Sequence, residues 1–108
     1  MDSQENFHDI AAALHRSYEL VPCYESIQSI DELRHALAER ITHLLATQPE
    51  KLMNILYRFD VNEEKIHEVF TTVFPFDIPL KVADLIIERQ YQKLLTRRLY
   101  SSGKPDFW

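Results

Sequence analysis

Two short motifs in this sequence carry the residue types of a metal centre. Glu5 and His8 form one E-x-x-H match, and Glu64 and His67 form a second. At this spacing a carboxylate and an imidazole share one face of a helix. Two such pairs, joined by further carboxylates, make the di-metal site of four-helix bundles. A metal-dependent bundle enzyme is therefore one alternative for the function.

The same two motifs also have a simpler interpretation, which we favour. Both lie in or near the first turn of a predicted helix, where the helix dipole stabilises carboxylates whatever their function. Matches of four residues also arise by chance in a chain with 17 acidic residues and five histidines. We therefore predict neither a metal nor another cofactor.

Two further groups of reactive side chains have ordinary explanations. His35, Glu39 and His43 form a ladder at four-residue spacing beside an apolar stripe, so we expect a solvated helix flank with pairs one turn apart. The lone Cys23 has no known signature around it, and half-buried packing is the usual state of such a cysteine. We predict no catalytic residue and no enzymatic activity.

The last predicted helix carries a basic row. Arg89, Lys93 and Arg97 recur every four residues, and Arg98 extends the row. Such a row could bind phosphates or an acidic protein face, although cations near a helix C-terminus also simply offset the helix dipole. Residues 1–80 hold six basic against 14 acidic residues, a net charge of −8 that would repel a phosphate backbone. A nucleic-acid accessory factor is therefore the weaker alternative.

Two large aromatic residues, Phe107 and Trp108, lie in a tail that follows the last predicted helix. Leaving them in water costs about 1.5–3 kcal/mol each relative to burial. We therefore expect them either to fold back into a groove of their own bundle or to insert into another subunit or partner. Gly103, the only glycine, falls where the helix must release the chain.

Five segments with apolar residues at helical spacing must position these groups. They cover about residues 4–18, 29–47, 49–59, 62–73 and 78–100, and the prolines fall between them or in a first turn. Ser29 with Glu32 forms a capping box, and Asn62 and Asp77 are expected to cap the last two helices. The fold class predicted is all-α: a compact single-domain bundle of about five helices over residues 1–100, with residues 101–108 as a tail.

The last of these segments is apolar over more than one face in its first half, which predicts a central C-terminal helix. Composition supports one ordinary globular domain, with 45% hydrophobic and 27% charged residues in 108 positions. A single glycine excludes the glycine-rich phosphate loops and the G-x-S-x-G elbow. No apolar run approaches the roughly 20 residues that span a bilayer, and the N-terminus is acidic. We expect a cytoplasmic protein without a membrane partner.

Residues 55–61 (ILYRFDV), residues 83–90 (ADLIIERQ) and Lys93 resemble small uncharacterised helical proteins of bacteria. The resemblance covers about residues 44–100. It implies a shared scaffold, and it brings no activity, cofactor or binding residue with it.

The same run also has a structural interpretation, because it spans a predicted tight corner between two helices. Asp60 is expected to accept amide hydrogens of the next helix, and Arg58 to meet the acidic opening of that helix. Arg89 and Gln90 follow the apolar half of the last helix, from which they could reach carbonyls at the corner.

These observations predict a small cytosolic protein without enzymatic activity, an interaction or accessory module. Its expected partner is another protein or a second copy of itself, and no small-molecule substrate is indicated. The residues expected to contact the partner lie on the last helix and the tail: Arg89, Lys93, Arg97, Arg98, Phe107 and Trp108.

Overall fold

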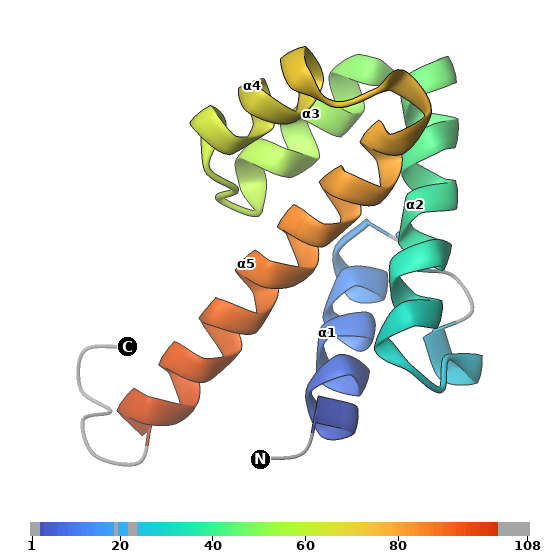
Figure 1. Cartoon of the computed structure of the whole chain (residues 1–108). Helices are drawn as coiled ribbons and strands as arrows, with labels where there is room; N and C mark the ends of the chain where they lie inside the picture. The colour runs from blue at the N-terminus through green and yellow to red at the C-terminus, as the bar shows by residue number, and fades with distance from the viewer. Residues whose placement is uncertain (1–2, 19, 22–23, 102–108) are drawn as a thin grey trace.

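The structure consists of helices joined by short connections. The computed structural model describes residues 3–18, 20–21 and 24–101, and Figure 1 shows how they are arranged. The α-helices are α1 (Ser3–Tyr18), α2 (Ile30–Thr47), α3 (Pro49–Arg58), α4 (Glu63–Thr72) and α5 (Ile78–Ser101). Two 3₁₀ turns, η1 (Tyr24–Ser26) and η2 (Pro75–Asp77), precede α2 and α5. The predicted all-α bundle of five helices is confirmed.

The long helix α5 is the element on which the others pack. It contacts α2 most extensively and also contacts α4 and α1, and in Figure 1 it runs diagonally past the other helices. Its inward residues Val82, Ala83 and Ile86 are fully buried in a core to which all five helices contribute. The central position predicted for α5 is therefore also confirmed.

Local hydrogen bonds set where two of the helices begin. The Ser29 hydroxyl accepts from the Glu32 amide at 3.1 Å, and the Glu32 carboxylate accepts from the Gln28 amide at 3.4 Å. The Asn62 side chain accepts from the amides of Glu64 and Lys65 at 2.8 and 3.1 Å. The first amides of a helix have no partner inside the helix, and serine and asparagine side chains commonly accept their hydrogens. Both caps were expected from the sequence for this reason.

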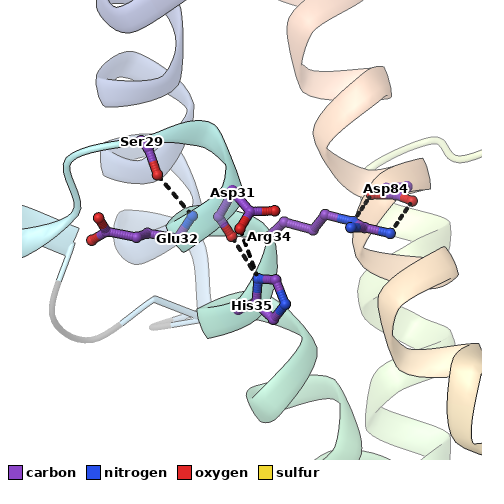
Figure 2. Close-up of polar contacts among 6 residues, drawn as sticks. All are labelled: Ser29, Asp31, Glu32, Arg34, His35 and Asp84. Carbon is purple, nitrogen blue, oxygen red and sulfur yellow. Dashed lines mark hydrogen bonds and ion pairs between the residues drawn. The ribbon is translucent and has the colours of Figure 1, made fainter.

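A bidentate ion pair fastens α2 to α5. The Arg34 guanidinium donates from Nε to Asp84 Oδ1 at 2.6 Å and from Nη2 to Oδ2 at 3.2 Å. Figure 2 shows this pair beside His35, whose Nδ1 lies 2.9 Å from the Asp31 carbonyl oxygen one turn earlier. The hydrogen bond and charge of Asp84 raise the pKa of Arg34 above its usual value. The flank expected around His35 is present, whereas the Arg34–Asp84 pair was not foreseen.

The Asn62→Ala variant is expected to lower the free energy of unfolding by about 1 kcal/mol, because two α4 amides lose their acceptor. Urea unfolding followed by circular dichroism measures this loss. The Asn62→Asp variant is the control, since aspartate caps as well as asparagine does. Equal stability of the alanine variant and the wild type would show that the cap contributes little.

Candidate functional site

The corner between α3 and α4 is built around a residue with a left-handed backbone. Asp60 has φ 63°. This left-handed conformation is unfavourable for most residues, but aspartate tolerates it because its short polar side chain can form local hydrogen bonds. The Asp60 amide donates to the Tyr57 carbonyl at 3.0 Å, and the Val61 amide donates to the Leu56 carbonyl at 3.1 Å. This pair of bonds is the Schellman ending of a helix. It turns the chain sharply and fixes Tyr57 and Val61 close to each other.

Arg89 of α5 holds this corner in place. Its Nε donates to the Asp60 carbonyl oxygen at 3.0 Å, and its Nη2 lies 2.9 Å from Asp60 Oδ2. The expectation that Arg89 reaches a corner carbonyl is confirmed. The expectation for Asp60 is corrected, because its carboxylate pairs with Arg89 while Asn62 accepts the amides of α4. Gln90 is buried, and it lines a hollow with residues of α1 and not the hollow at the corner.

The basic row behind Arg89 is electrostatically coupled. Burial lowers the pKa of Lys93 below its ordinary value, and the positive charges of Arg89 and Arg97 lower it further, while Asp60 opposes them. Lys93 is half-buried and Arg97 is exposed. The Arg98 side chain, like Phe107 and Trp108, lies outside the described residues. Of the described cations in this row, Arg89 bonds to the corner, whereas Arg97 lines a hollow with residues of α1.

An apolar groove lies between α3 and α4, beside the corner. Its volume is about 630 Å³, and its polar lining is limited to Asn54, Glu63 and His67. The apolar lining consists of Met53, Leu56, Tyr57, Val61, Ile66 and Phe70. Leu56 and Ile66 are buried, but Met53 is 47% exposed and Tyr57 is 76% exposed. The groove thus pairs a buried apolar floor with large apolar side chains left open to solvent.

The groove continues into the polar corner. Tyr57, Val61 and Glu63 also line a second hollow of about 560 Å³, whose other walls include Asp60 and Arg89. An occupant of the groove that extended past Tyr57 would therefore meet the contact that fastens the corner to α5.

Sequence reasoning missed this groove, although one signal pointed to it. The helix α3 has only ten residues, and its core stripe already uses Leu52, Ile55 and Leu56. Met53 and Tyr57 lie one turn apart, so they share a face outside that stripe. A second apolar face on so short a helix indicates a surface that something else can cover.

The residues of the metal alternative are not gathered into one site. His8, Glu64 and His67 are exposed, and the His8 ring packs against Phe7 with ring centroids 4.3 Å apart. The Glu5 side chain and Cys23 lie outside the described residues. Within the part of the chain that the structure describes, no group of three or more His, Cys, Asp or Glu residues could hold a metal ion.

Comparisons with known proteins add no function to this picture. No protein family, no curated protein and no solved structure matches the chain, so the resemblance over residues 44–100 stays a prediction. Over the described ranges, none of the helices combines the length and apolar character needed to cross a membrane.

The Arg89→Ala variant is expected to lower the free energy of unfolding by about 1–2 kcal/mol, because the corner loses a charged hydrogen bond and an ion pair. Asp60→Asn keeps the left-handed backbone and the carbonyl acceptor, so its loss is expected to stay below about 1 kcal/mol. Chemical denaturation measures both. Arg58→Ala, at an exposed arginine of the same corner, is the control; an Arg89→Ala variant as stable as the wild type would assign Arg89 to the surface instead.

The Lys93→Met variant is expected to be more stable than the wild type at neutral pH, because methionine fills similar space without a charge. In the wild type, folded Lys93 releases its proton at a lower pH than the unfolded chain does. Stability from this group therefore rises as pH passes from the lowered pKa toward the usual value of about 10.4. Melting temperatures of both proteins across the alkaline range should converge, and a less stable variant at neutral pH would contradict the prediction.

Proposed function

We propose that this protein is a small interaction module without enzymatic activity, which binds a short segment of protein in the groove between α3 and α4. The observation that carries the proposal is the exposure of Tyr57 and Met53 beside the buried Leu56. Contiguous apolar surface on a soluble domain commonly marks a binding site, and tyrosine and methionine are enriched in protein interfaces.

The dimensions of the groove favour an occupant with two large apolar side chains. Met53 and Tyr57 lie one helical turn apart on α3, and Ile66 and Phe70 lie one turn apart on α4. One turn rises about 5.4 Å, so each helix offers two successive positions at which an apolar side chain can lie. The volume of about 630 Å³ falls in the range of pockets that enclose small ligands.

The basic side of α5 is the second part of the proposed contact surface. Arg97 is exposed and Lys93 is half-buried, so both are available to acidic side chains of a partner. Arg89 donates hydrogen bonds to Asp60 and so fixes the corner next to this surface, and we assign Arg89 a positioning role. This division refines the expected partner-binding set, which included Arg89 together with Lys93 and Arg97.

A display library of random short peptides tests the proposal. The full chain is immobilised through its N-terminus and screened in parallel with the Phe107→Ser/Trp108→Ser double variant. The double variant keeps the chain length and removes the aromatic side chains of the tail. We expect enriched peptides to carry two large apolar residues. Their affinity for a Tyr57→Glu form of the same protein should fall at least about tenfold, as for a central interface tyrosine.

Phe76→Glu is the matched control. Phe76 is 82% exposed but lines neither the groove nor the corner hollow, so its loss should leave peptide binding unchanged. The proposal is wrong if neither parent protein enriches any peptide, or if Tyr57→Glu and Phe76→Glu weaken binding equally.

A further inference from the structure

The α3–α4 groove lies within reach of the residues that follow α5. Arg89 contacts Asp60 at the corner end of the groove, and α5 continues for twelve residues to Ser101. At 1.5 Å per residue this part of the helix carries the chain about 18 Å away from the corner. The seven residues 102–108 span at most about 23–25 Å when extended. A fully extended chain that reversed direction directly after Ser101 would therefore bring Trp108 back to the level of the corner, where Tyr57 and Val61 line a hollow with Arg89.

The sequence after α5 is suited to such a reversal. Gly103 is the only glycine in the chain, and glycine accommodates the positive φ with which many helices release the chain. Pro105 has a fixed φ and biases the preceding Lys104 toward an extended backbone. After a turn near residue 103, the five residues 104–108 span at most about 17–18 Å, which returns Trp108 to about the level of Arg89.

The chemistry of the same residues matches the groove. Phe107 and Trp108 are the two large apolar side chains of residues 102–108, and the groove offers two successive apolar positions on each of its helices. Each aromatic side chain removes about 150–250 Å² from water when it is buried. A tethered segment also has an effective concentration in the millimolar range, so contacts too weak for a free peptide still fill the site.

We infer that residues 102–108 fold back on their own molecule and that Trp108 docks against Tyr57 and Val61, at the corner end of the α3–α4 groove. This inference rests on the proposed function, because it names the first occupant of the proposed binding site. The tail then covers the corner end of the groove in the isolated protein, and a protein partner must displace it.

Trp108 makes the docking directly measurable, because it is the only tryptophan in the chain. Selectively excited tryptophan fluorescence of the full protein therefore reports on the tail alone. We expect emission at short wavelength and protection from a soluble quencher in the wild type. In Tyr57→Glu the emission should move to longer wavelength and the quenching constant should rise severalfold. Phe76→Glu, which alters an equally exposed aromatic outside the groove, should behave as the wild type.

Two further measurements keep the test decisive. Met53→Glu is a second groove variant at an exposed position, and far-ultraviolet circular dichroism establishes that each variant is folded. Docking within one molecule predicts emission that does not change on dilution. Emission that moves to longer wavelength on dilution would overturn the inference in favour of docking into a second copy.

The outcomes separate this inference from the proposed function. A fully quenchable Trp108 in the wild type, together with peptides that bind through Tyr57, overturns the inference and leaves the function standing. Protection of Trp108 that is lost in both groove variants supports the inference, whatever the peptide library yields. Protection that survives both groove variants places the tail elsewhere and overturns the inference.

Discussion

The structure depends on the burial of one face of α5. Val82, Ala83 and Ile86 are fully buried, and α5 contacts α2, α4 and α1. Ala83 has no bulk beyond its methyl group, so neighbouring backbones can approach closely at that level. The buried face of the short helix α4 packs against this core. What remains of its apolar surface, together with that of α3, forms the walls of the groove.

The corner at Asp60 connects the fold to the candidate site. Its left-handed backbone ends α3 and directs Val61 inward, while its carbonyl and carboxylate both bind Arg89. One residue therefore sets the geometry of the groove and its attachment to α5. The Asp60 carboxylate is largely exposed, so its ion pair with Arg89 contributes little to the stability of the corner. The backbone turn and the hydrogen bond from Arg89 to the Asp60 carbonyl contribute more.

Much of the fold could be predicted from the sequence, and the groove could not. Apolar spacing identified the helices, and the short-range chemistry of Ser29 and Asn62 identified two helix starts, because these signals act within one turn. The Arg34–Asp84 pair joins residues 50 positions apart, and no local pattern selects those partners. The groove was missed for a related reason. Spacing shows that Tyr57 lies outside the core stripe of α3, but only the placement of α4 shows which surface it lines.

At Gln90 the surface of α5 changes from largely buried or half-buried to largely exposed. Before it the inward face is apolar; after it the helix continues to Ser101 with Tyr91, Gln92, Leu95 and Arg97 exposed. An isolated helix of this length is marginal in water, so the part of α5 beyond Gln90 depends on the buried half and on the α1 residues that face Leu94 and Arg97. Each residue that leaves the helix exchanges a rise of 1.5 Å for about 3.4 Å of extended chain. Any unwinding of α5 from Ser101 would therefore lengthen the reach of the residues that follow it.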